Sequence, residues 1–309
     1  MIGLLMLLAL RKAMSYRSDG QPQLKYFLAS DFNAKSRPFS FQYGRYTIHG
    51  ERFSYGEDKP KGVVVFFHGM GAGYTAYTQE ICFLARRGYL VYAYDNLGCM
   101  TSEGRGINNL CEALKIQHRF FEFLDGEDEA KGLERFAIGH SWGGYAALGA
   151  CLPEYRISKI VSISGFLSPS QMIVNAEPSM KKFKPLIQWA LLIGYGKDGL
   201  SVGRRLSKSN AKVFYIQGDK DNIVPLEYGY EAIKEVYGDD QRLTLRLVKG
   251  SGHNPYWSYN AQLYFLDLMG NKKITHRDFD NHHEIDYAKL NHDDPSIMNG
   301  IVSFLDEKE

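Results

Sequence analysis

The chain has 309 residues, of which 44% are hydrophobic and 23% are charged, and its formal net charge is +2. This length suits one large α/β domain with a modest insertion, and the composition is that of an ordinary globular protein. The small net charge and the lack of a long basic run exclude a nucleic-acid-binding surface. We therefore expect no nucleic-acid partner.

The first ten residues are apolar throughout and are followed by Arg11 and Lys12. A membrane-spanning helix needs about 20 apolar residues, and a signal peptide carries its positive charge first, so neither pattern is met. The interpretations left are a short interfacial anchor, a misplaced translation start, or a helix packed on the domain. We expect residues 1–39 to be an apolar segment and linker, and an anchor would give weak membrane association through residues 1–12.

The four cysteines lack metal-ligand spacing and do not form the pattern of a secreted disulfide framework. They are Cys82, Cys99, Cys111 and Cys151. This usage favours a reducing, cytoplasmic setting, with membrane association if the first residues anchor the chain.

From residue 41 onward the chain alternates predicted strands and helices. Residues 41–55 alternate large or β-branched with polar side chains, with Gly44 and Gly50 as breaks, and predict an antiparallel pair of strands. Further strands are predicted at 63–67, 89–94, 136–138, 156–165, 212–216 and 242–248, and helices at 78–87, 109–124, 145–151, 226–237 and 295–305. This alternation predicts right-handed crossovers and a mostly parallel sheet. Residues 13–40 predict no firm element.

Residues 138–145, IGHSWGGY, place a serine between a strand and a helix. A turn this sharp strains the backbone of Ser141, and only small neighbours such as Gly139 and Gly143 let the strand and the helix approach closely. We expect Ser141 Oγ to project above the carboxyl end of the strand, with the Trp142 N–H facing an oxyanion formed beside it. The alternative is an accidental Gly/Ser turn.

A serine hydroxyl becomes a nucleophile when a base and an orienting carboxylate are supplied from elsewhere in the chain. Asp219 and Asp221 follow one predicted strand, and His253 follows the next. These candidates should meet, because ligands of parallel sheets bind outside the carboxyl ends of the strands. His140 is nearer to Ser141 in sequence, but on a strained turn its side chain should point away from the serine.

The order serine, aspartate, histidine resembles that of the α/β-hydrolase superfamily over roughly residues 40–309. The resemblance implies an α/β-hydrolase domain: a mostly parallel central sheet flanked by helices, with a small helical cap inserted after the sixth strand, at about 166–210. It also implies that Ser141, Asp221 and His253 are catalytic. The family pattern Gly-x-x-Asp-x-x-Val-Pro, present at 218–225, selects Asp221 over Asp219.

In the same family the loop after the first parallel strand carries a His-Gly pair, here His68-Gly69. The resemblance implies that the Met70 N–H is the second oxyanion donor, opposite the Trp142 N–H. The alternative interpretation of this glycine-rich loop is a flexible connector. A phosphate-binding loop is disfavoured, because its Gly-Lys-Ser/Thr ending is missing.

No metal or organic cofactor is expected, since acyl transfer needs only the three catalytic residues and water. Six polar residues near the end of the chain could be mistaken for a metal site: His276, Asp278, Asp280, His282, His283 and Glu284. Their spacing matches no recognised ligand set, so a solvated loop is the expected structure.

The sequence favours a serine hydrolase that cleaves a carboxylic ester through an acyl-enzyme. GHSWGG with a cap looks like the lysophospholipase and monoacylglycerol lipase branch, and small or medium acyl esters are the expected substrates. The apolar residues of the cap either line an acyl pocket or form only the cap's own core. The alternative function is a serine aminopeptidase or amidase, with Glu177 as the candidate anchor for a substrate α-amine. A non-catalytic ligand-binding α/β-hydrolase is the third hypothesis. Serine at the elbow excludes dehalogenase and epoxide hydrolase chemistry, which needs a carboxylate there.

Overall fold

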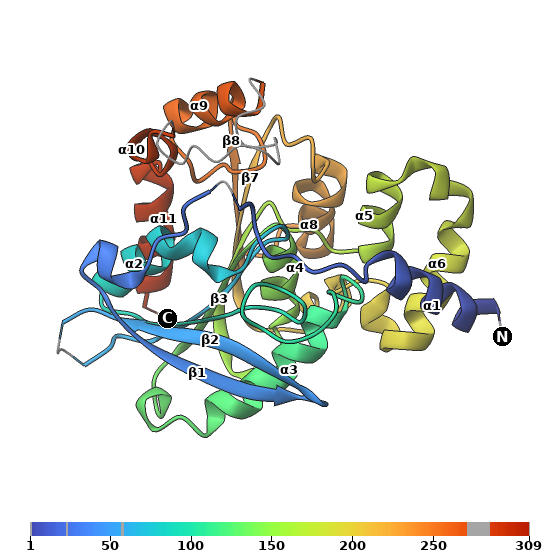
Figure 1. The fold of residues 1–309 in the computed structure, drawn as a ribbon, viewed down its shortest axis with the longest axis horizontal. Coiled ribbons are helices and arrows are strands. Elements are labelled where there is room, and N and C mark those ends of the chain that lie inside the picture. Colours follow the sequence, from blue (N-terminus) through green and yellow to red (C-terminus); the bar gives the residue numbers. More distant parts are fainter. Residues whose placement is uncertain (1, 23, 57–58, 271–284, 309) are drawn as a thin grey trace.

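The computed structural model describes residues 2–22, 24–56, 59–270 and 285–308, and is built on one eight-stranded sheet in the order β1-β2-β4-β3-β5-β6-β7-β8 (Figure 1). The strands are β1 Lys35–Tyr43, β2 Tyr46–Ser54, β3 Val63–Phe67, β4 Leu90–Tyr94, β5 Arg135–His140, β6 Ile157–Ile163, β7 Lys212–Gly218 and β8 Leu243–Val248. β2 pairs antiparallel with β1 and β4, and the remaining pairs are parallel. The predicted mostly parallel sheet is confirmed.

Helices cover both faces of this sheet. They are α1 Ile2–Ala13, α2 Thr78–Arg86, α3 Glu112–Asp125, α4 Trp142–Gly149, α5 Pro169–Ala176, α6 Lys184–Tyr195, α7 Gly203–Leu206, α8 Tyr230–Tyr237, α9 Tyr259–Gly270, α10 Tyr287–Leu290 and α11 Pro295–Asp306. One buried core joins the sheet to α3, α4 and α8, and the other joins its opposite face to α2 and α11.

The two cores explain why the central strands are apolar without alternation. In β3, Val63, Val65 and Phe67 enter the first core, while Val64 and Phe66 enter the second. Successive side chains of a strand point to opposite faces, so a strand covered on both sides must be apolar at every position.

The first hairpin differs from the prediction. β1 begins at Lys35, inside the region for which no element was predicted, because Pro38 and charged side chains hide the strand pattern at a sheet edge. Gly50 is not a break: it lies inside β2, between Phe39 of β1 and Tyr94 of β4. A Cβ atom there would lie 2.4 Å from Ala93 O, so this glycine allows close approach of two strands.

The segment between β6 and β7 holds α5, α6 and α7 and lies at one end of the molecule (Figure 1). It is the segment for which the sequence predicts a cap, and we call it the helical insertion (residues 166–210). Two polar contacts tie it to the core. Tyr195 Oη donates to Glu112 Oε2 at 2.6 Å, and Arg205 bonds both Asp198 and the Gly149 carbonyl.

α1 packs on the helical insertion. Gly3, Leu7 and Leu10 form its buried face, and Leu7 and Leu10 pack with Ile187 and Leu191 of α6. Of the interpretations open at the sequence level, the packed helix is therefore the one observed. None of the helices in the described residues is long and apolar enough to cross a membrane.

We predict that Leu7→Ala loosens α1 whereas Leu8→Ala does not. Leu7 is 4% exposed and its neighbour Leu8 is 50% exposed. Truncating a buried leucine costs about 2–5 kcal/mol, so the free energy of opening α1 should fall in Leu7→Ala alone. Amide hydrogen exchange of α1 measures this, and equal exchange in the two variants would contradict the packing described.

Candidate active site

The turn between β5 and α4 holds Ser141 in a strained conformation. Its φ is 56° and its ψ is −117°, a region that L-residues rarely occupy. Two backbone hydrogen bonds fix the turn: Ser141 N–H donates to Ile163 O of β6 at 2.8 Å, and Tyr145 N–H donates to Ser141 O at 3.0 Å. The side chain is partly exposed at the carboxyl edge of the sheet.

Two glycines make this turn sterically feasible. A Cβ atom on Gly139 would lie 2.1 Å from Gly143 O, and one on Gly143 would lie 1.9 Å from Phe67 O. Both distances are far below van der Waals contact. β5, α4 and β3 can therefore meet this closely only with glycine at these positions.

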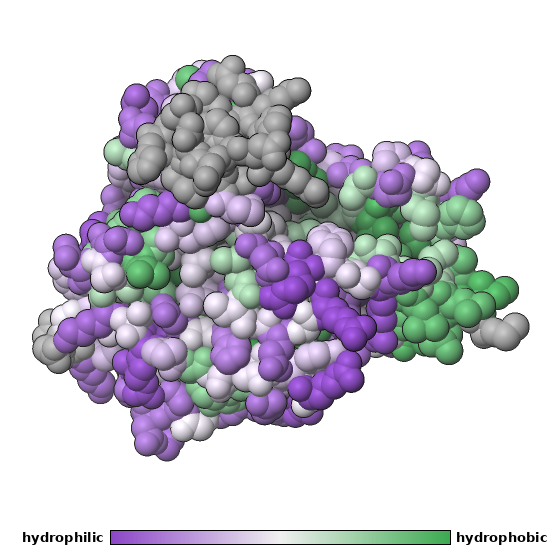
Figure 2. Space-filling view, viewed as in Figure 1, coloured by the Kyte–Doolittle hydropathy of each residue, from purple (hydrophilic) through white to green (hydrophobic). Residues whose placement is uncertain are grey.

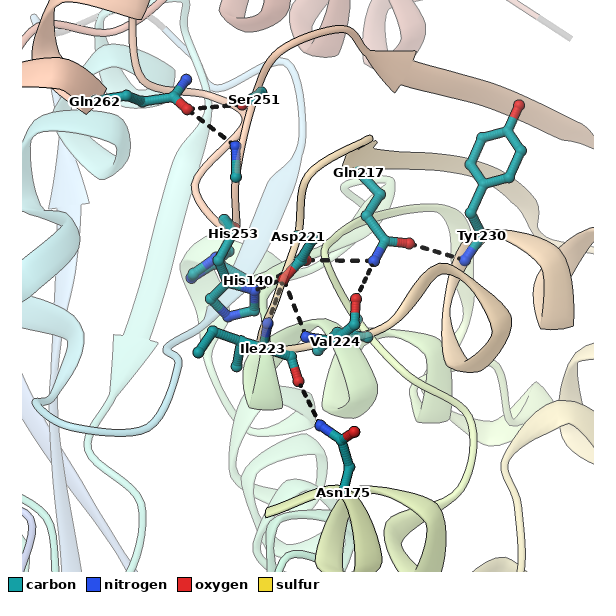
Figure 3. Close-up of polar contacts among 12 residues, drawn as sticks. His140, Asn175, Gln217, Asp221, Ile223, Val224, Tyr230, Ser251, His253 and Gln262 are labelled. Atoms are coloured by element: carbon teal, nitrogen blue, oxygen red, sulfur yellow. Dashed lines mark hydrogen bonds and ion pairs between the residues drawn. The ribbon is translucent and has the colours of Figure 1, made fainter. Parts of the chain in front are cut away.

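The structure brings Asp221 and His253 together (Figure 3). His253 Nδ1 lies 2.9 Å from Asp221 Oδ1 and 3.0 Å from Oδ2, and the Asp221 side chain is fully buried. Burial alone would raise the pKa of this carboxyl. The hydrogen bond and charge of His253, with the N–H groups of Ile223 and Val224, outweigh burial and hold the pKa below its ordinary value.

Asp219, the competing carboxylate, lies elsewhere in the same loop. Its Oδ1 accepts a hydrogen bond from the Gly250 N–H at 2.7 Å. It therefore braces the turn after β8, and Asp221 is the carboxylate that contacts His253.

His253 Nε2 remains available, since Nδ1 is engaged by Asp221. The Ser141 hydroxyl makes no hydrogen bond to any residue within the described part of the chain. Such a geometry is usual without substrate, because catalytic hydrogen bonds of free enzymes are often long and tighten when substrate binds.

The two predicted oxyanion donors lie on different elements. Trp142 occupies the first position of α4, where its N–H has no intrahelical acceptor, and its indole is buried with Nε1–H donating to Leu110 O. Met70 follows β3 and is 41% exposed. His68 shapes this loop, because its ring bonds Gly69 O at 2.7 Å and accepts from the Asn96 N–H at 2.9 Å.

His140 links the loop of Met70 to the loop of His253. Its Nε2 lies 2.9 Å from His253 O, and its Nδ1 lies 2.9 Å from Tyr77 Oη, which accepts from the Gly69 N–H at 3.1 Å. A carbonyl can only accept, so the proton sits on Nε2 and Tyr77 donates to Nδ1. Burial lowers the pKa of His140 to about 3, which keeps the ring neutral. As predicted, the side chain serves other partners than Ser141.

Two glutamines in this network were not identified from the sequence. Gln217 Nε2 donates to Val224 O at 2.6 Å and to Asp221 Oδ2 at 3.3 Å (Figure 3). Gln262 Oε1 accepts from Ser251 Oγ and from the Gly252 N–H, just before His253. Gln217 could have been found from the sequence, because it is a polar residue inside the apolar strand at 212–218. Gln262 could not, because its partners are distant in sequence.

Among the residues that the structure describes, no group of three or more His, Cys, Asp or Glu side chains could hold a metal ion. The polar stretch that the sequence predicts to be a solvated loop, from His276 to Glu284, lies outside the described residues. All four cysteines are free and buried.

A mostly parallel sheet with a strained serine after its central strand, and an Asp–His pair after two later strands, defines the α/β-hydrolases that use a serine nucleophile. The chain has the α/β-hydrolase fold, with Ser141, Asp221 and His253 in the chain order that serine hydrolases of this fold use. Residues 58–194 match the family model described as serine aminopeptidase, S33. None of the curated proteins compared with the chain matches it.

Solved structures share the fold at low sequence identity. An esterase of Pyrococcus furiosus is 17% identical, with a TM-score of 0.58, and the match covers 83% of this chain and 96% of that one. An acylaminoacyl peptidase of Pyrococcus horikoshii is 18% identical, with a TM-score of 0.57, over 72% of this chain and 38% of that one.

We predict that Asp221→Asn lowers kcat about 10⁴-fold, because the imidazole of His253 would lose its orienting carboxylate and its correct tautomer. Asp219→Asn is the matched control and should leave kcat within a few-fold. Steady-state kinetics of the two variants makes the comparison. Equal losses would mean that the Asp221–His253 contact is not the functional one.

A second prediction concerns pH and His140. An unfolded histidine has a pKa of about 6.5, while His140 has a pKa of about 3, so below pH 6.5 the unfolded chain binds a proton that the folded chain does not. The stability contribution of neutral His140 is complete above pH 6.5 and is lost as pH falls toward 3, by about 1.4 kcal/mol per pH unit. Urea unfolding at several pH values should show a shallower acid loss in His140→Gln than in the natural chain. Identical slopes would contradict the neutral bridge.

Proposed function

We propose that the protein hydrolyses a carboxylic ester through an acyl-enzyme on Ser141. The observation that carries this proposal is the hydrogen bond between Asp221 and His253, whose carbonyl lies 2.9 Å from the ring of His140, the residue directly before the strained Ser141. This arrangement supplies a nucleophile, a base and an orienting carboxylate at one edge of the sheet.

The cycle follows from these positions. His253 Nε2 takes the proton of Ser141 as Oγ attacks the ester carbonyl, and the N–H groups of Met70 and Trp142 donate to the oxyanion. His253 then gives its proton to the departing alkoxide, which leaves as an alcohol. Water, deprotonated by His253, attacks the acyl-enzyme, and collapse of the second oxyanion returns the proton to Ser141 and releases the acid. Asp221, ionised because its pKa is lowered, stabilises the imidazolium in both steps.

Apolar side chains near the site support ester substrates of small or medium acyl length, such as lysophospholipid-like or monoacylglycerol-like esters. α5 of the helical insertion lies beside the Asp221 loop, since Asn175 Nδ2 donates to Ile223 O at 3.1 Å (Figure 3). Beside Met70 a cleft of about 280 Å³ is lined largely by aromatic and aliphatic side chains, Phe27, Trp257 and Phe265 among them, and Met70 is its link to the site, since Ser141 and His253 do not line it. Such linings bind acyl or alkyl groups. The esterase of Pyrococcus furiosus, which matches along nearly its whole length, gives further support.

The family description favours a second candidate, a serine aminopeptidase or amidase. An aminopeptidase needs a carboxylate to hold the substrate α-amine, and Glu177 is the candidate in the insertion. Its side chain is exposed at the end of α5, and Oε1 accepts from Ser179 Oγ at 2.6 Å. This surface position of Glu177 favours ester hydrolysis over peptide hydrolysis as the function.

The test is hydrolysis of a p-nitrophenyl ester series from acetate to palmitate, with Ser141→Ala as the control. We expect activity that peaks at one acyl length and that disappears in the variant, because an acyl pocket accepts only chains that fit it. Aminoacyl anilides are assayed in parallel, with Glu177→Gln as a second variant. Serine-dependent cleavage of anilides without ester cleavage would replace the proposal by the peptidase alternative.

A further inference from the structure

α1 is apolar on the face that no other element of the described residues covers. Its buried face uses Gly3, Leu7 and Leu10, yet Ile2, Leu4, Leu5 and Leu8 are each at least 50% exposed. A helix with one covered face normally turns polar residues to water. The first polar side chain of α1 is Arg11. The outer face of α1 would therefore be stabilised by a second apolar partner.

α6 of the helical insertion extends this surface. Trp189, Leu192 and Ile193 are 48%, 39% and 49% exposed and lie within one turn of each other. They adjoin α1, because a Cβ atom on Gly3 would lie 2.7 Å from Ile193 and 3.1 Å from Trp189. Figure 2 shows apolar surface gathered at this end of the molecule, where Figure 1 places α1 and α6. We call these seven side chains the α1–α6 patch.

Positive charge borders the α1–α6 patch. Exposed lysines lie at the ends of the two helices, Lys12 after the last apolar turn of α1, Lys181 and Lys182 before α6, and Lys197 after it. None of them forms an ion pair with a described residue. In residues 2–13 and 177–197 the only acidic residue is Glu177.

We propose that the α1–α6 patch docks the protein on an anionic lipid bilayer. An apolar surface with a tryptophan, bordered by lysines, suits the boundary between acyl chains and negatively charged headgroups. α1 has 12 residues, too few to span, so it would lie in the interface. A second copy of the chain fits less well, because a two-fold dimer through this patch would bring like-charged lysines together.

Docking in this way would orient the catalytic site. Tyr195, at the end of α6, bonds Glu112 of the core, and Asn175 of α5 bonds the loop of Asp221. The helical insertion therefore connects the bilayer-facing surface to the site by direct contacts. The docking proposal does not depend on the proposed ester hydrolysis.

The experiment is co-sedimentation of the full chain with phosphatidylcholine vesicles that contain one-third phosphatidylglycerol. Leu5→Gln, at a 58% exposed position in the patch, should weaken partitioning about tenfold, because it removes one buried leucine from the interface. Leu28→Gln, at a 63% exposed position away from the patch, is the matched control and should bind like the natural chain. Thermal unfolding of both variants checks that they are folded.

Two further measurements separate the electrostatic contribution of the lysines from the apolar contribution of the patch. Lys181→Gln with Lys182→Gln should weaken binding to these vesicles about fivefold for each lysine and change little on pure phosphatidylcholine. Vesicles should shift tryptophan emission to the blue, and Trp189→Phe should remove most of this shift, because Trp142 is buried and Trp257 lines the cleft beside Met70 rather than the patch. Ser141→Ala should bind like the natural chain, so loss of activity and loss of docking are told apart.

Three results would overturn the docking proposal. The first is no sedimentation with the anionic vesicles. The second is an equal effect of Leu5→Gln and Leu28→Gln. The third is a concentration-dependent dimer in analytical ultracentrifugation that Leu5→Gln abolishes, which would make the occupant of the patch a second copy of the chain.

Discussion

The site depends on one steric constraint, the close contact of β3, β5 and α4 around Ser141. The serine keeps a positive φ because Gly139 and Gly143 let backbone atoms meet where any side chain would collide. The two cores that pack on both faces of the sheet offset the free energy of this strain. A rigid sheet thus holds Ser141 at its edge, directly before the first amide of α4.

Around this fixed point the other loops are held by polar side chains. His140 joins the loop of Gly69 to that of His253, Gln217 joins β7 to the loop of Asp221, and Gln262 supports the turn before His253. All three are uncharged groups, and each makes at least one hydrogen bond to a backbone atom. Buried neutral networks of this kind fix geometry without the cost of burying charge.

The helical insertion faces in two directions. Toward the core it is tied by Tyr195 and Arg205, and toward solvent it shares an apolar, lysine-bordered surface with α1. Packing on the core explains the residues on the side that faces the core. The second side has no such explanation in the folded chain alone, which is why a bilayer is proposed as its partner.

Much of this architecture could be predicted from the sequence, because its signals are local. The apolar runs of β3 to β7 follow from burial on both faces, and glycines around Ser141 follow from the sharp turn. Chain order and spacing also named Asp221 and His253, which the fold then brings into contact. Other features depend on distant partners: the start of β1, the role of Gly50, the bridge through Tyr77 and His140, and the packing of α1 on α6. These contacts join residues far apart in the chain, and only the tertiary structure decides which distant groups meet.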